Sequence, residues 1–598
     1  MFPDSNIAQQ FSLGKDKAGY YIHFGLAPFI KQKLVSLVNT CPFYVLLFDE
    51  ALNRISQKEQ MDIHVRFWHP ELNEVHTRYF NSVFLGHTKA TDLLGGIKEG
   101  LETLSLSKIS QISMDGPNVN WKLIDILKPE IQSSPSDPAL LELGSCGLHI
   151  LHGSYETGLK ATGWQINSFL SNLYYLFKDS PARRADYSRI TGSALFAKKF
   201  CATRWLDNTP ALERALNSLP HFEKYINEIK PKPSVISFQS TSNSIADKFL
   251  KAKLEFLISI ASILEPFLRK YQSSAPLIPF LFEDLEQIIH GLFARIIKPD
   301  ILSATTTTSK LLTLDISATS PNFLPLNKIN IGFGAKAAIK IPGVGEDLTS
   351  EFLNQCRRCI VSILSKIIER SPLNYALVRA CSALSPHLIS TKKETAFLRF
   401  DSLLQNLHLK NHISSVDADK CKNLFQRFCT DELYTSSLKS FEPTTKLDHF
   451  YTRLLQSEPD FAPLFDLIKR VLTLSHGNAS VESGFSCNEN ILVENLKEQS
   501  LISHRIVYDY IHQFDSFLDI PINKELLQYC RLARSRYHEY LDEEKKNQSS
   551  LESRSINKRK VEDQIRELEA KKSKLNEDHA IENSTIDSEI RKLKFSQF

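Results

Sequence analysis

Residues 109–121 read ISQISMDGPNVNW, an apolar run rich in β-branched residues that stops on Asp115. The chain then turns through Gly116 and Pro117 into a helical pattern. A short apolar run bounded by turn residues is typical of a buried strand. The carboxylate at its end is either a turn residue or a functional group.

Three other strand patterns precede this one. Residues 43–50, FYVLLFDE, form an apolar run of strand length that also stops on a carboxylate, Asp49. Residues 60–70 and 74–86 alternate between apolar and polar side chains, with turn residues between them, and this pattern predicts a hairpin.

Helical patterns at 89–106 and 119–127 flank the strand that ends at Asp115, and residues 141–145 predict a fifth strand. Three antiparallel strands followed by two crossover units form a mixed sheet with helices on its faces. This order is that of an RNase H-like fold. The expected class is therefore an α/β core joined to an all-α part.

Beyond about residue 153 the strand signal fades, and long amphipathic patterns predict a large helical insertion that interrupts the core. Residues 303–347, rich in Thr, Ser, Gly and Pro, predict a long loop or linker. The expected segments are a helical lead-in (1–40), the RNase H-like core (41–200), the helical insertion (201–463), a region that completes the core (464–520) and a charged tail (537–598).

Composition places the chain among globular proteins. Of its 598 residues 42% are hydrophobic and 23% charged, and the net charge is only +4, so contact with nucleic acid would need local basic patches. The ten cysteines lack the spacing of a disulfide framework, which indicates a reducing compartment. No apolar run reaches the length of a membrane span, so we expect no membrane role.

The tail carries apolar residues at Val561, Ile565 and Leu568, then Leu575, with spacings of four and three that predict a coiled-coil seam. Polar residues interrupt this seam, so a solvated helix or a disordered tail is the alternative.

Asp49 and Asp115 end strands that lie side by side in an RNase H-like sheet, so their carboxylates would meet at one edge. Carboxylate oxygens hold the pair of hard cations that phosphoryl transfer by two metals requires. Each aspartate alone is equally explained as a turn or capping residue, and a third carboxylate would have to come from elsewhere in the chain.

Five segments, FDEALN, ISMDGPNVNW, GSCGLHILHG, ATRWLDN and NASVESGFSCNEN, together resemble transposases of the hAT superfamily and their domesticated relatives. The resemblance implies that Asp49, Asp115 and Glu482 are a DDE triad that binds Mg²⁺ or Mn²⁺. Ser483 stands where the family usually has arginine.

Cys146 and His149 match the Cys-x-x-His motif of that family, which would place His149 near the scissile phosphate; the alternative is that both residues pack a helix against the sheet. One Cys-x-x-His motif lacks the ligands for a structural zinc ion, so none is expected. Cys356 and Cys359 form an isolated pair, which favours two half-buried thiols.

Arg204 and Trp205 match the Arg-Trp motif of the family. The resemblance implies that Arg204 contacts phosphate and that Trp205 stacks on a flipped base. An Arg-Trp pair that anchors a helix in the core is the alternative.

Two functional hypotheses follow. The first is a DNA transposase that cuts and joins strands; the second is a catalytically inactive, domesticated nuclear protein that acts through dimerisation and DNA or protein binding. Residues 464–520 correspond to the dimerisation region of the family, so we expect a homo-oligomer, although packing within the chain would explain those helices equally well. No small-molecule substrate is expected.

Basic clusters in the tail are compatible with nuclear localisation, although a solvated helix face explains them equally well. The sequence shows no zinc finger of the BED class that such transposases commonly carry, so recognition of a specific DNA site is unsupported. The clusters are Lys558, Arg559 and Lys560, then Lys571, Lys572 and Lys574, with a further group at Lys198, Lys199 and Arg204.

Overall fold

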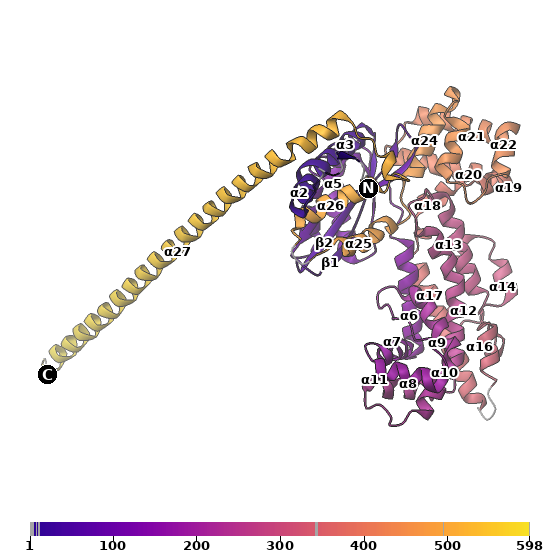
Figure 1. The fold of residues 1–598 in the computed structure, drawn as a ribbon, viewed down its shortest axis with the longest axis horizontal. Coiled ribbons are helices and arrows are strands. Elements are labelled where there is room, and N and C mark those ends of the chain that lie inside the picture. The colour runs from indigo at the N-terminus through magenta and orange to yellow at the C-terminus, as the bar shows by residue number, and fades with distance from the viewer. Residues whose placement is uncertain (1–4, 7–8, 10–11, 341–344, 494–495, 597–598) are drawn as a thin grey trace. The chain divides into compact units, whose positions relative to one another are not determined.

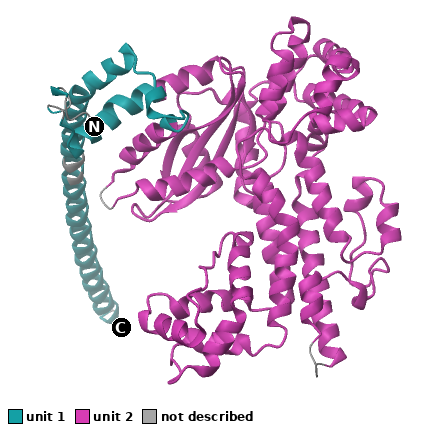
Figure 2. Cartoon of the chain, turned by 45° about the vertical axis from the view of Figure 1, so that its right-hand side comes forward, with its two compact units in different colours: residues 1–30, 510–598 teal, residues 31–509 magenta. Residues whose placement is uncertain are grey.

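The computed structural model describes residues 5–6, 9, 12–340, 345–493 and 496–596. The chain divides into two compact units, one of Met1–Ile30 with Tyr510–Phe598 and one of Lys31–Asp509 (Figure 2). The larger unit contains the sheet and the helical insertion.

The sheet has four strands, β1 (Tyr44–Asn53), β2 (Lys58–His69), β3 (Glu74–Leu85) and β4 (Ile109–Ser113), in the order β3-β2-β1-β4 (Figure 1). β1 pairs antiparallel with β2 and parallel with β4, and β2 pairs antiparallel with β3. The mixed sheet, the hairpin and the adjacency of β1 and β4 confirm the coarse α/β prediction.

One face of the sheet is packed against three helices: α3 (Ala27–Thr40), α4 (Ala90–Gly100) and α5 (Asn118–Ile131). Successive strand residues point to opposite faces, so Leu46 and Phe48 enter this core while Leu47 enters the core of the helical insertion. Each fully buried aliphatic or aromatic side chain of this kind contributes roughly 1.5–3 kcal/mol. Because both faces are covered, β1 is apolar along most of its length.

The prediction of a fifth strand at 141–145 is wrong. This segment is irregular, although Leu141 N donates to Ser110 O (2.8 Å) and Cys146 N donates to Met114 O (3.1 Å). Gly144 has a φ of 85°, which lies outside the extended region of a strand. The segment therefore follows β4 through isolated hydrogen bonds and does not form a continuous ladder.

The helical insertion begins directly after that segment. The long helix α17 (Glu346–Arg370) crosses α6 (Gly147–Thr162) closely at Gly158, where a Cβ atom would lie 2.9 Å from the Cys359 carbonyl oxygen. The other helices from here to the end of the insertion are α7 (Ile166–Phe177), α8 (Pro181–Thr191), α9 (Thr209–Asn217), α10 (Leu219–Glu228), α11 (Ile236–Ile245), α12 (Leu250–Tyr271), α13 (Ile278–Phe293), α14 (Pro299–Ala304), α15 (Thr308–Leu312), α16 (Phe333–Ala338), α18 (Ala376–Cys381), α19 (Pro386–Thr391), α20 (Lys393–Leu409), α21 (Ser415–Thr430), α22 (Glu432–Lys439), α23 (Leu447–Leu455) and α24 (Ala462–Thr473).

The predicted loop at 303–347 is more ordered than expected over its described part, which excludes 341–344. It contains α15 and α16, and its apolar side chains Leu311, Ile329 and Ile331 are buried in the helical core. Burial of these apolar side chains stabilises the segment, and its turn-rich composition does not predict that burial.

Two further helices close the larger unit, α25 (Ala479–Ile491) and α26 (Glu498–Ile511). Within 464–520, Ile468 and Val471 are fully buried inside the chain. For these two side chains, packing within the chain is therefore the explanation that holds. Self-association through this region stays a prediction.

The smaller unit joins α2 (Lys15–Tyr21) and the π-helical turn that follows it to α27 (Lys524–Phe595). Gly25 permits this contact, because a Cβ atom there would lie 3.3 Å from the Cα of Cys530. The charged tail is thus a single helix, and pairing along its seam stays a prediction. Among the described residues, no helix combines the length and the apolar character needed to cross a bilayer.

Candidate functional site

Asp49 and Asp115 lie level with each other on neighbouring strands. β1 and β4 pair in parallel as far as Leu47 and Ser113, and each aspartate follows two residues later. Burial, followed by the negative charge of Asp115, raises the pKa of Asp49 to about 7. The expectation that the first strand stops at Asp49 is wrong, because β1 continues to Asn53 and pairs with β2 throughout. Asp49 therefore lies inside β1, whereas Asp115 follows the end of β4, and the charge of Asp115 still acts on Asp49.

Each aspartate has one hydrogen-bond donor that orients it. Glu50 N donates to Asp49 Oδ1 (3.0 Å), and the buried Asn120 donates through Nδ2 to Asp115 Oδ1 (2.6 Å). Asn120 lies in the first turn of α5, which starts right after the Gly116–Pro117 turn. Burial raises the pKa of Asp115 above its usual value, although the positive charge of His149 and the bond from Asn120 oppose this. The turn at Gly116 and Pro117 therefore positions α5 so that Asn120 donates to the Asp115 carboxylate.

Glu482 reaches the same site from the first turn of α25. Two contacts place that helix against the sheet: Asn478 Nδ2 donates to Phe48 O (2.9 Å), and Gln111 exchanges hydrogen bonds of 2.8 and 2.7 Å with the backbone of Ser475. Phe48 directly precedes Asp49, and Gln111 lies in β4. A backbone carbonyl of β1 and a side chain of β4 therefore hold the segment that leads into the helix with the third carboxylate.

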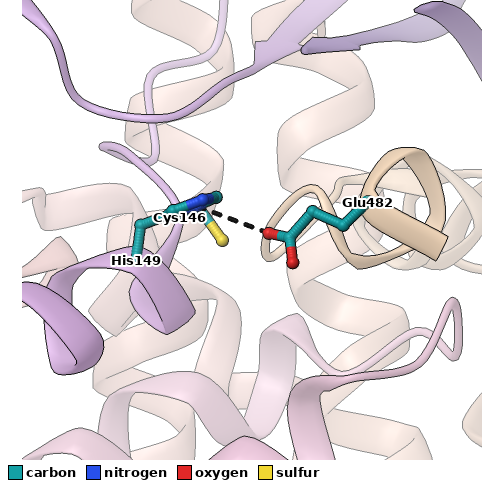
Figure 3. A group of neighbouring side chains, drawn as sticks. All are labelled: Cys146, His149 and Glu482. Carbon is teal, nitrogen blue, oxygen red and sulfur yellow. Dashed lines mark ion pairs between the residues drawn. The ribbon is translucent and has the colours of Figure 1, made fainter. Parts of the chain in front are cut away.

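The carboxylate of Glu482 lies between two basic side chains. Arg204 Nη2 is 2.6 Å from Oε2, and His149 Nδ1 is 3.4 Å from Oε1, the contact drawn in Figure 3. The Glu482 side chain is only 11% exposed. The negative charge of Glu482 also raises the pKa values of Asp49 and Asp115, after larger contributions from burial. Glu482 thus influences both aspartates electrostatically, although among the described residues the three carboxylates do not form a group whose ligand atoms all lie within 4.8 Å of one another.

Cys146 and His149 lie at the start of α6, next to Glu482 (Figure 3). Burial by itself would lower the pKa of His149, but its hydrogen bond to Cys146 and the charges of Cys146, Glu482 and Asp49 raise it to about 10. His149 is therefore placed to carry a positive charge among carboxylates.

Trp205 is buried in this structure. It begins the short 3-10 helix Trp205–Asn208, is 8% exposed, and packs edge-on against Phe200 at a centroid distance of 5.2 Å. The arrangement matches the core-anchor alternative, and base stacking by Trp205 stays a prediction. Arg204 is partly exposed and directed at Glu482 rather than away from the site.

Two further acidic residues lie at or near the site, and the sequence patterns do not single them out. Burial and the charges of Asp49 and Asp115 raise the pKa of Glu50 to about 8. Asp62 belongs to an alternating strand pattern, yet it is fully buried and accepts from Asn488 Nδ2 (2.8 Å) on α25. The adjacency of Asp49 and Glu50 was a visible signal for the first, whereas nothing in the sequence signals the second.

Cys356 and Cys359 are both fully buried in α17, and burial raises the pKa values of both thiols. The prediction of two half-buried thiols is therefore wrong in degree, because both side chains are completely enclosed by the helical core.

No protein-family model matches this chain, and no curated protein matches it either.

Proposed function

We propose that the protein is an hAT-like relative with an RNase H-like core, and that it cleaves and transfers DNA strands by DDE chemistry at Asp49, Asp115 and Glu482. The observation that carries the proposal is the convergence of three carboxylates from β1, the end of β4 and the first turn of α25. Asp115 and Glu482 both act on the protonation of Asp49. Buried carboxylates with raised pKa values cluster at functional sites more often than elsewhere.

The donor set fits Mg²⁺ or Mn²⁺. Both ions prefer oxygen ligands, and the three carboxylates supply them beside a poorly solvated strand end. When bound, such ions activate an attacking oxygen and stabilise the leaving oxygen of a phosphodiester. Burial and then the charge of Asp115 raise the pKa of Asp49, and a bound divalent cation would stabilise its ionised form.

Arg204 and His149 would give the site its affinity for phosphate. Both carry positive charge next to Glu482, and Arg204 can exchange that carboxylate for a DNA phosphate because guanidinium binds either in the same planar geometry. That exchange would free Oε2 of Glu482 to act as a ligand. Phosphate contacts position the DNA without selecting a sequence.

Strand nicking is the direct test. Full-length protein with supercoiled DNA and Mn²⁺ should produce nicked circles, and Asp115→Asn should reduce the rate by about a hundredfold or more. Asp125→Asn is the matched control, because Asp125 lies on the adjacent α5 with its side chain 73% exposed. Absence of nicking, or equal rates for the two variants, would refute the proposal.

A second candidate function is a domesticated nuclear protein that binds DNA or protein as a homo-oligomer without catalysis. The observation in its favour is that Arg204 and His149 both contact Glu482 in this structure, while Ser483 replaces an expected arginine. For this function, wild-type protein should bind duplex DNA and sediment as an oligomer at micromolar concentration without nicking. A monomer that does not bind DNA would contradict it.

A further inference from the structure

The side chains of Cys146, His149 and Glu482 form a group of potential metal ligands. One ligand atom from each residue lies within 4.8 Å of the other two (Figure 3). Sulfur, imidazole nitrogen and carboxylate oxygen together are the donor set of zinc, whereas Mg²⁺ and Mn²⁺ prefer oxygen alone. The chemistry of this group thus differs from that of the three carboxylates.

The two best-defined donors are spaced as zinc ligands are. His149 Nδ1 and Glu482 Oε1 are 3.4 Å apart. Two donors bound at about 2.0–2.1 Å from one tetrahedral Zn²⁺ lie roughly 3.3 Å from each other. The existing separation therefore matches that of two ligands on one ion.

Neither atom has a partner outside this group. His149 Nδ1 and Glu482 Oε1 are buried, and apart from the contact of His149 with Cys146 they have no hydrogen-bond partner among the described residues. Buried polar atoms are rarely left unpaired, because their desolvation is then uncompensated. A shared cation would satisfy both.

The surroundings hold the three ligands in place. Cys146 is 2% exposed, and its Sγ would lie 2.7 Å from a Cβ atom at Gly477, so the segment just before α25 lies directly against this thiol. Arg204 binds Oε2 of Glu482 at 2.6 Å and leaves Oε1 facing His149. Such outer contacts orient ligands at known metal sites.

We propose that Cys146, His149 and Glu482 bind a zinc-class ion, with a fourth position open to water or a substrate oxygen. The Cys-x-x-His motif alone has too few ligands, and the fold adds the third from α25. Zinc binding stands independently of the proposed nuclease activity. One consequence rests on that function: an ion at this group would engage Glu482 and so compete with Mg²⁺ or Mn²⁺ at the DDE residues.

Cobalt substitution tests the site directly. Full-length protein stripped with a chelator and titrated with Co²⁺ should develop the visible bands of a tetrahedral complex and an ultraviolet thiolate-to-cobalt charge-transfer band. Both should saturate at one ion per chain and disappear when one equivalent of Zn²⁺ is added. Cys146→Ser should abolish the charge-transfer band, and His149→Ala and Glu482→Gln should each weaken Co²⁺ binding at least tenfold.

Cys201→Ser is the matched control, because Cys201 is a partly exposed thiol outside the group, and it should leave the spectrum unchanged. Circular dichroism of each metal-free variant identifies any loss of fold. A wild-type spectrum without a charge-transfer band, or one retained in a folded Cys146→Ser variant, would overturn the proposal and would show that only a protonated His149 pairs with Glu482.

Asp49→Asn separates this proposal from the proposed function. It should abolish nicking and leave the Co²⁺ spectrum intact. If nicking depends on Asp49 but no cobalt spectrum forms, the zinc site fails and the nuclease stands. If the spectrum forms but no variant changes nicking, the zinc site stands and the proposed nuclease fails.

Discussion

The two faces of β2 are both buried but are held by different forces. Met61, Ile63 and Val65 enter the apolar core beneath α3, α4 and α5. The alternate residues Asp62 and His64 face the other side and are equally buried. Apolar contacts are non-directional and tolerate sliding, whereas hydrogen bonds require specific positions. The comparison indicates that the apolar face of β2 stabilises the sheet, whereas its polar face determines the positions of helices that are distant in the sequence.

The polar face holds the segment that carries Glu482. Asp62 accepts from Asn488 Nδ2 (2.8 Å) on α25, and also from Ser82 Oγ (2.6 Å) and Gln60 Nε2 (2.8 Å). Arg66, likewise buried on this face, donates through Nε to Thr473 O (2.8 Å) at the end of α24. The carboxylate site at one end of the sheet thus depends on a polar network within it.

Loss of the Asp62 carboxylate should have the largest effect on stability. Asp62→Ala removes the acceptor of Gln60, Ser82 and Asn488 in a buried place and leaves Asn488 Nδ2 without its acceptor, so the free energy of unfolding should fall by about 3–5 kcal/mol. Denaturant unfolding followed by tryptophan fluorescence would measure it. The folded fraction should also show weaker Co²⁺ binding, because α25 loses its position. A loss below about 1 kcal/mol would contradict a structural role for this network.

Removal of one carboxylate charge should act in the opposite direction. The folded-state pKa of Asp49 is raised, so the native protein binds a proton more tightly than the unfolded chain, and stability falls as the pH rises from about 4 to about 7. Asp49→Asn should therefore raise the free energy of unfolding at pH 7, in metal-free buffer, by about 1–3 kcal/mol. The gain should vanish at pH 4. A destabilised variant at both pH values would contradict this electrostatic account.

A lower pH should reduce the free energy of unfolding through His64, which lies on the polar face of β2. Burial and the positive charge of Arg505 lower the pKa of His64 to about 3. The unfolded chain binds a proton near pH 6.5 and the folded chain does not, so the contribution of His64 is complete above pH 6.5. As the pH falls from 6.5 to about 3, the contribution of His64 to the free energy of unfolding decreases by about 1.4 kcal/mol per pH unit.

Measured unfolding free energies between pH 7 and 5 should therefore fall less steeply in His64→Gln than in wild type. His408→Gln is the control, because His408 is exposed, and its slope should equal that of wild type. Equal slopes for all three proteins would rule out a neutral, buried His64.

The apolar face should respond least to a conservative change. Ile63→Val removes one buried methyl group, for an expected loss of about 0.5–1.5 kcal/mol. Co²⁺ affinity should be unchanged, since no described residue of α25 belongs to the apolar core on this face. If Ile63→Val weakened Co²⁺ binding as much as Asp62→Ala, the division between the two faces would be refuted.

Local patterns predicted the strands and their neighbours well, because side-chain period and turn residues are short-range signals. Asp49 and Asp115 could be paired from strand order alone. The segment at 141–145 could not be read correctly, since an apolar run does not reveal that Gly144 leaves the extended region.

The polar face was beyond prediction for a different reason. Alternation in β2 distinguishes two faces but does not reveal that the polar one will be covered by helices from the far end of the sequence. Glu482 was reached only through family resemblance, and its contacts with Arg204 and His149 follow from long-range packing that no local pattern encodes.

The most direct test of the account is Mn²⁺ binding measured by electron paramagnetic resonance on wild type, Asp49→Asn, Asp115→Asn and the control Asp125→Asn. If Asp49 and Asp115 hold ions together with Glu482, each of the first two variants should bind Mn²⁺ at least tenfold more weakly, while the control matches wild type. Equal Mn²⁺ binding by all four proteins would show that the carboxylates do not form a metal site.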